Sequence, residues 1–193
     1  MEDKPPFRKG ANMKATGIVR RIDDLGRVVI PKEIRRTLRI READPLEIFT
    51  DREGQIILKK YSPIGEMTTF AKQYAESLAS VSAKTAFIAD RDQIIATAGG
   101  SKSMLGKSIS KELDEKMTNR ETFVVTDADK KMVPVVDEQK EEFKQQAVSP
   151  IICEGDVIGA VIIVDMDDKN KMGEVEKKLV QSAAAFLGRQ MEQ

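Results

Sequence analysis

The chain of 193 residues is long enough for one medium domain or two small ones. Apolar residues make up 40% and charged residues 33%, a balance that excludes both a disordered chain and a membrane protein. There is no histidine and only one cysteine, Cys153, which excludes Ser-His and Cys-His catalytic sites, cysteine zinc knuckles and internal disulfides. No apolar run approaches the ~20 residues of a membrane span and no signal core opens the chain, so we expect a cytoplasmic protein without a membrane partner.

The net charge is zero, but it is unevenly distributed. Residues 1–60 carry 15 Lys and Arg against 10 Asp and Glu, whereas residues 61–193 carry 17 against 22. The basic excess is densest in residues 13–41, where seven arginines and two lysines accompany three acidic residues. This separation predicts two modules with different partners.

Breaks in the pattern set the predicted boundaries. Residues 1–12 contain Pro5, Pro6 and Gly10 without periodicity, and we interpret them as an added or disordered extension. Residues 61–65 contain two helix and strand breakers and form a predicted linker. The predicted modules are therefore residues 13–60 and 66–193.

The first module has the pattern of a small β-rich domain. Alternating apolar residues predict strands at 16–22 and 27–30, joined by a turn at 23–26. Pro31 is suited to open a short helix that ends near Leu38, and a hairpin follows at 46–50 and 55–59. A module of this size without disulfides or metal ligands rarely folds alone, so we expect two copies to share one core.

The segment Met13–Leu38, and above all Leu25–Pro31 (LGRVVIP), closely resembles the DNA-binding domain of AbrB-type transition-state regulators. The similarity continues through Ile57–Tyr61. The resemblance implies a swapped-hairpin dimer, in which two chains interleave their strands. It also implies DNA contacts by four arginines, Arg20, Arg27, Arg35 and Arg36. We add Arg21 and Lys14 to this set of predicted DNA-binding residues.

The residue types of this module agree with DNA as its partner. Arginine suits both phosphates and guanine edges. Residues 13–60 contain no asparagine and one glutamine, Gln55, so the side chains that read adenine are nearly missing. We therefore expect phosphate contacts and recognition of DNA shape. Phe49 alone makes a poor stacking platform for single strands, which favours double-stranded DNA.

The second module has the pattern of an α+β domain. Apolar spacing predicts helices at 67–81, 109–117 and 175–187. Hairpins are predicted at 85–98 and 147–164, with brief strands at 123–125 and 133–136, and Pro134 confines the latter to a sheet edge. Terminal helices around an antiparallel sheet define the expected architecture.

Ser149–Val161 resembles the final hairpin of GAF domains, and the element order extends this likeness over residues 66–191. The resemblance implies a ligand pocket between the sheet and its crossing segments, and pairing through the terminal helices. The polar run 137–146 would lie near such a pocket, although a solvated loop is its favoured interpretation. Cys153 lies in an apolar strand, which favours packing over redox sensing.

Together the resemblances imply a DNA-binding transcription regulator of sporulation-type gene expression, either activator or repressor. Its GAF-like domain would govern assembly into a tetramer, as a dimer of dimers, and sense a small-molecule ligand. One alternative is a swapped-hairpin antidote that binds a toxin protein. Another is a GAF-type enzyme such as a methionine sulfoxide reductase, for which Cys153 lacks a resolving partner. We expect no catalytic residue, no metal and no cofactor.

Overall fold

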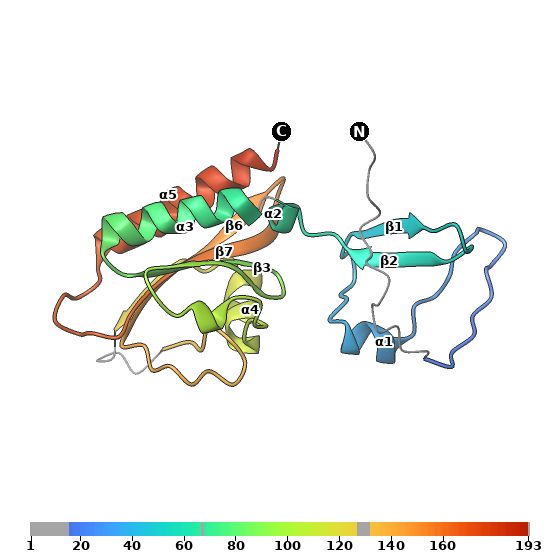
Figure 1. Cartoon of the computed structure of the whole chain (residues 1–193), viewed down its shortest axis with the longest axis horizontal. Helices are drawn as coiled ribbons and strands as arrows, with labels where there is room; N and C mark the ends of the chain where they lie inside the picture. Colours follow the sequence, from blue (N-terminus) through green and yellow to red (C-terminus); the bar gives the residue numbers. More distant parts are fainter. Residues whose placement is uncertain (1–15, 67, 127–131, 193) are drawn as a thin grey trace. The chain divides into compact units, whose positions relative to one another are not determined.

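The structure, a computed structural model, describes residues 16–66, 68–126 and 132–192 (Figure 1). It divides into two compact units between Asp44 and Pro45. The elements in chain order are α1 (Lys32–Thr37), β1 (Leu46–Thr50), β2 (Ile56–Lys60), α2 (Pro63–Glu66), α3 (Thr68–Ser82), β3 (Thr85–Asp90), β4 (Ile94–Ala98), the 3-10 helix η1 (Lys102–Met104), α4 (Lys111–Thr118), β5 (Phe123–Thr126), β6 (Gln145–Cys153), β7 (Asp156–Asp165) and α5 (Glu174–Gln190).

A five-stranded sheet forms the framework of the second unit. Its order is β4-β3-β7-β6-β5, and every neighbouring pair is antiparallel. The long central strands β6 and β7 are joined by Glu154 and Gly155, whose positive φ angles of 49° and 89° suit a two-residue hairpin turn. The predicted hairpins at 85–98 and 147–164 are confirmed, as are the two terminal helices.

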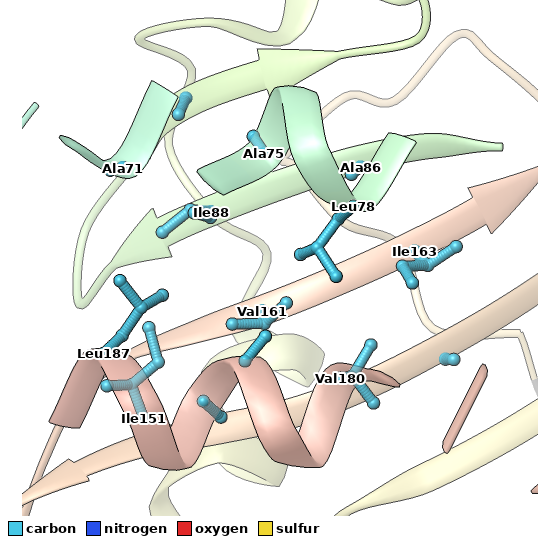
Figure 2. Packing of buried hydrophobic residues seen from close by; sticks show 14 of the residues in the cluster. Ala71, Ala75, Leu78, Ala86, Ile88, Ile151, Val161, Ile163, Val180 and Leu187 are labelled. Atoms are coloured by element: carbon cyan, nitrogen blue, oxygen red, sulfur yellow. The ribbon is translucent and has the colours of Figure 1, made fainter. Parts of the chain in front are cut away.

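Both faces of this sheet are covered, α3 and α5 lying on one face and α4 on the other (Figure 1). In Figure 2, Val161 and Ile163 of β7 lie on the sheet face that α5 covers with Val180 and Leu187. The intervening residue Ile162 points to the opposite face, toward α4. Strand β7 is apolar on both sides because each side meets a helical layer, which explains its almost unbroken apolar sequence.

The prediction of a strand at Val133–Val136 is wrong. A single bridge joins Val136 to Ile109 there. Pro134 has no N–H to donate, and Val133 bonds instead to a side chain: its N–H donates to Oε1 of Gln146, and its carbonyl accepts from Nε2. An irregular crossing segment therefore covers the α4 face of the sheet at this point.

The described elements of the basic region, residues 13–60, are each five or six residues long. Helix α1 follows Pro31, as predicted, and the predicted hairpin is confirmed as β1 and β2, which pair from Leu46 with Lys60 to Thr50 with Ile56. This hairpin belongs to the second compact unit by its contacts. The predicted domain boundary at residues 61–65 remains a prediction.

Residues 16–22 and 27–30 form no strand in the single chain. The prediction of two strands here is therefore wrong for the isolated chain. The turn between them is present, because the N–H of Gly26 donates to the carbonyl of Asp23 at 3.0 Å. A strand is defined by ladder hydrogen bonds, and these segments have no neighbouring strand among the described residues of one chain. Their apolar side chains are exposed: Ile18, Val19, Ile22, Val28 and Val29.

Candidate nucleic-acid interface

The predicted DNA-binding arginines all lie on the surface of the first unit. Arg20 and Arg21 lie between the exposed residues Val19 and Ile22, Arg27 follows the turn, and Arg35 and Arg36 lie on α1. Each of the five is exposed. Lys14, the sixth predicted residue, lies outside the described residues. The arginines predicted from the sequence are therefore accessible to an anionic partner and are not buried in a core.

Arg27 is held by the turn that precedes it. Its Nε donates to Oδ2 of Asp23 at 2.9 Å, while Oδ1 of Asp23 accepts the backbone N–H groups of Leu25 and Arg27 at 3.0 and 2.8 Å. These bonds lower the pKa of Asp23, with the N–H of Arg27 as the largest cause, so the carboxylate is charged at neutral pH. The sequence indicates Asp23 as a turn former, whereas its contact with Arg27 is visible only in the folded loop.

Helix α1 presents the next two arginines from its last turn. Cations are favourable there because the C-terminal end of a helix carries partial negative charge. Nε of Arg35 also donates to the carbonyl of Ile30 at 3.2 Å, which ties its guanidinium to the segment before the helix. Arg36 makes no such bond within the described part of the chain.

The arginine cluster separates into two groups. Among the described residues, no acidic side chain pairs with Arg20, Arg21 or Arg36. Arg39 and Arg41 differ from these, since both are half-buried and engaged within the chain. The backbone N–H of Arg41 donates to Oδ2 of Asp44 at 2.8 Å. The exposed arginines outside this second group are therefore the ones that can neutralise phosphates, although Asp23 offsets part of the charge of Arg27.

A compact joint links the end of β2 to the turn between β3 and β4. Nζ of Lys60 lies 2.5 Å from Oδ2 of Asp92, and both side chains are half-buried. Oγ of Ser62 donates to Oδ2 of the buried Asp90 at 3.2 Å. Ile64 is 1% exposed and packs in the α3–α5 layer. The predicted linker is thus fastened to the sheet at several points.

The α4 face, where the GAF resemblance places a ligand, is filled by the protein's own side chains. Phe87, Ile162 and Leu113 are fully buried there, and Phe143 lies 6.1 Å from Phe87 between ring centres. The predicted pocket run 137–146 contributes to this packing through Phe143 and Gln146. A groove of about 470 Å³ lies elsewhere, between β5 and the start of α5, lined in part by Phe123, Met172 and Lys177.

Cys153 is the last residue of β6 and is half-buried. Its place in an apolar strand predicts burial in the core, so the side chain is more exposed than expected. Burial, followed by the nearby charges of Glu154, Glu192 and Asp156, raises the pKa of its thiol. A reactive cysteine needs a lowered pKa, because the thiolate is the nucleophile. The surroundings of Cys153 therefore oppose redox chemistry.

Comparisons with known proteins match two parts of the chain separately. Residues 66–192 match the family model "Stage V sporulation protein T C-terminal, transcription factor". Stage V sporulation protein T of Bacillus subtilis (strain 168) is 57% identical over 182 residues, which cover 94% of this chain and all of that protein. The chain belongs to the stage V sporulation protein T family.

The basic region has relatives of its own. Residues 19–66 match the model "Antidote-toxin recognition MazE, bacterial antitoxin". The transition state regulatory protein AbrB of Bacillus subtilis (strain 168) is 69% identical over 51 residues, 26% of this chain and 52% of that protein. The chain thus joins an AbrB-like N-terminal domain to the C-terminal domain of the stage V sporulation protein T family.

The C-terminal domain of this family member has the GAF fold. The GAF domain of an Acinetobacter phosphoenolpyruvate-protein phosphotransferase superposes with a TM-score of 0.54 at 11% identity, covering 65% of this chain and 81% of that one. At this identity the likeness shows the fold alone. None of the helices in the described ranges is long and apolar enough to cross a membrane.

Proposed function

We propose that the chain is a DNA-binding transcription regulator of sporulation-type gene expression that acts in the cytoplasm on double-stranded DNA. The observation that carries the proposal is the group of exposed arginines around the Asp23 turn, of which only Arg27 pairs with an acidic residue among the described residues, in a segment 69% identical to AbrB over 51 residues. Positive groups in this density favour a polyanion, because each phosphate contact releases a counterion from DNA.

A dimer of the basic region follows from its exposed apolar residues. The turn bond from the N–H of Asp23 to the carbonyl of Arg27 sets the hairpin register, which places Ile22 opposite Val28. Ile18 and Ile30 share that face, because strand side chains alternate, and Arg20 lies on it opposite Ile30. A face of four large apolar residues is unstable in water, and a second copy supplies the missing cover in a swapped-hairpin dimer.

A second interface is proposed at the terminal helices of the C-terminal domain. Phe70, Tyr74 and Phe186 stack between α3 and α5, with ring centres 5.5 to 6.3 Å apart. Phe186 remains 41% exposed, and Val81 and Val175 are exposed on the same two helices. Two separate dimer interfaces on one chain generate a tetramer, which light scattering of the full chain at micromolar concentration would detect.

The DNA proposal is tested by salt dependence. Arg20, Arg27, Arg35 and Arg36 give about eight candidate contacts per dimer, so log affinity should fall with log salt at a slope of about −5 to −7. Replacing one of them by alanine should weaken binding to many sequences and flatten the slope by about one unit. Arg52→Ala, in the loop between β1 and β2, is the control that should leave the slope unchanged. A salt-independent affinity would overturn the proposal.

We infer that the C-terminal domain, through a small-molecule ligand or through assembly, controls DNA affinity by way of the Lys60–Asp92 joint. The joint holds the chain that leads from the basic region against the sheet, so a shift of the sheet is passed on. Asp92→Asn should change DNA affinity about 2- to 5-fold in the full chain. Asp168→Asn, which affects an exposed pair with Lys144 at 3.9 Å, is the matched control. Equal affinity of both variants and the wild type would remove this part of the proposal.

Two alternatives receive less support. Toxin binding has the antitoxin family match in its favour, but the AbrB-like segment here continues into a folded domain rather than a short acidic tail. An enzymatic role has Cys153 as its candidate, and the raised pKa of that thiol opposes it. A regulator without catalytic activity is therefore the function proposed.

A further inference from the structure

Two loops of the chain share one backbone geometry. Each begins with an aspartate and ends in a glycine with positive φ: Asp23 with Gly26, and Asp51 with Gly54. Oδ1 of the aspartate accepts the N–H groups two and four residues later, at 3.0 and 2.8 Å in the first loop and at 2.9 Å twice in the second. The glycine N–H donates to the aspartate carbonyl at 3.0 and 3.4 Å. The second loop is thus an internal reference for the first.

The loops differ in the residue after the glycine. In the first, Nε of Arg27 donates to Oδ2 of Asp23 at 2.9 Å. In the second, Gln55 turns to Glu53, with its Nε2 3.2 Å from Oε2. Within the described residues, the second carboxylate oxygen of Asp51 has no hydrogen-bond partner. Building the loop therefore requires only Oδ1, and Oδ2 of Asp23 is left for Arg27.

The Nε contact fixes the guanidinium while leaving its outer edge free. Arginine has five N–H donors in a rigid plane, and the four on Nη1 and Nη2 remain available. The Arg27 side chain is 69% exposed, so that edge faces solvent. An arginine that is already oriented loses less rotamer freedom when it binds.

We propose, on the basis of the DNA-binding function above, that Asp23 is a positioning residue that presents Nη1 and Nη2 of Arg27 for bidentate contact with one pair of acceptors on DNA. The pair is either two phosphate oxygens or O6 and N7 of a guanine, which share this geometry. Asp23 itself opposes the attraction of phosphates, because its carboxylate is negative. Asp23 therefore favours binding by orienting Arg27, and it disfavours binding by weakening the sequence-independent attraction to phosphates.

Asp23→Asn separates the role of Oδ1 in the loop from the contact of Oδ2 with Arg27. Asparagine keeps Oδ1 and with it both loop N–H bonds, but its NH₂ group cannot accept from Nε of Arg27. The experiment uses the full chain as wild type, Asp23→Asn, Arg27→Ala and the double variant, with Asp51→Asn as the matched control. Affinity is measured by fluorescence anisotropy for a duplex selected by the wild type from a random pool and for the unselected pool.

We expect Asp23→Asn to weaken binding to the selected duplex about 5- to 10-fold and to have no further effect, within about twofold, when Arg27 is already alanine. A loss confined to the selected duplex assigns the acceptor pair to a guanine, and a loss on both DNAs assigns it to a phosphate. Asp51→Asn should change neither affinity.

Three results would overturn the positioning role: no loss for Asp23→Asn, an equal loss in the Arg27→Ala background, or an equal loss for Asp51→Asn. Each would show that Asp23 acts through the loop alone or not at all. If Arg27→Ala itself left both affinities unchanged, the proposed contact of Arg27 with DNA would fail instead. The two failures are therefore distinguishable.

Discussion

Strand β7 and the segment 16–30 are both rich in apolar residues, yet the structure treats them in opposite ways. Residues 160–164 of β7 are at most 1% exposed, with helical layers on both sides. Ile22 and Val29, in contrast, are 67% and 70% exposed. The apolar pattern thus indicates which side chains favour burial. It does not indicate whether the residues that cover them belong to the same chain or to a second copy. The contrast supports the proposed dimer interface of the basic region.

The largest effect is expected from a charge on that surface. Val28→Asp should abolish dimerisation of the basic region, because an unpaired carboxylate would be buried between two copies at a cost of several kcal/mol. DNA affinity should fall at least about 100-fold, since half of the contacts on a paired site are lost. Anisotropy with a selected duplex measures the affinity, and light scattering measures the assembly.

Leu105→Asp is the control for Val28→Asp. Leu105 is 56% exposed in the C-terminal domain, against 53% for Val28, so the two substitutions are matched in exposure and chemistry. Leu105→Asp should leave affinity and mass unchanged. Comparable affinities for the two variants would mean that Val28 is an ordinary surface residue.

The same contrast explains what the sequence could predict. Hairpins at 85–98 and 147–164 were predictable because each has a turn between two apolar runs that pair within the chain. The strand expected at 133–136 failed because Val133 bonds to the Gln146 side chain, a long-range contact without a local signal. The arginines predicted to bind DNA followed from the family resemblance and remain a prediction. Asp23 was missed although the Asp-x-x-Gly spacing recurs at Asp51, because only three-dimensional geometry shows Oδ2 at Nε.

A second prediction concerns the closed core of the C-terminal domain. A Cβ atom on Gly188 of α5 would lie 2.1 Å from the carbonyl oxygen of Ile152, so the helix backbone packs directly on the β6–β7 hairpin. Gly188→Ala gains about 1 kcal/mol in helix propensity but forces this backbone contact apart. We expect a net loss of about 1–2 kcal/mol and a melting temperature several degrees lower, measured by calorimetry.

Ser182→Ala, at an exposed position of the same helix, is the control and should change the melting temperature by about one degree at most. DNA affinity at 25 °C should be unaltered by Gly188→Ala as long as the domain remains folded. An unchanged melting temperature would show that α5 can move away from the hairpin without loss.

The smallest effect is expected at Asp90, where the joint meets the sheet. Asp90 is 5% exposed, and this burial raises the pKa of its carboxyl, although the N–H groups of Asp92 and Gln93 donate to Oδ1 at 2.7 and 2.8 Å. The neighbouring Asp92 carboxylate, which pairs with Lys60, adds a smaller repulsion in the same direction. Because the folded state binds the proton more tightly than the unfolded state, Asp90 lowers stability as pH rises through its raised pKa.

Asp90→Asn keeps the Oδ1 acceptor and removes the buried charge. The variant should therefore melt about one to three degrees higher than the wild type at pH 7.5, a gain that shrinks as pH falls toward the ordinary aspartate pKa of 3.8. Calorimetry between pH 7.5 and 4.5 measures the difference, with Asp156→Asn at an exposed position as the control. A gain that stayed constant with pH would show that the substitution acts through packing, and it would remove Asp90 as a source of pH dependence at the joint.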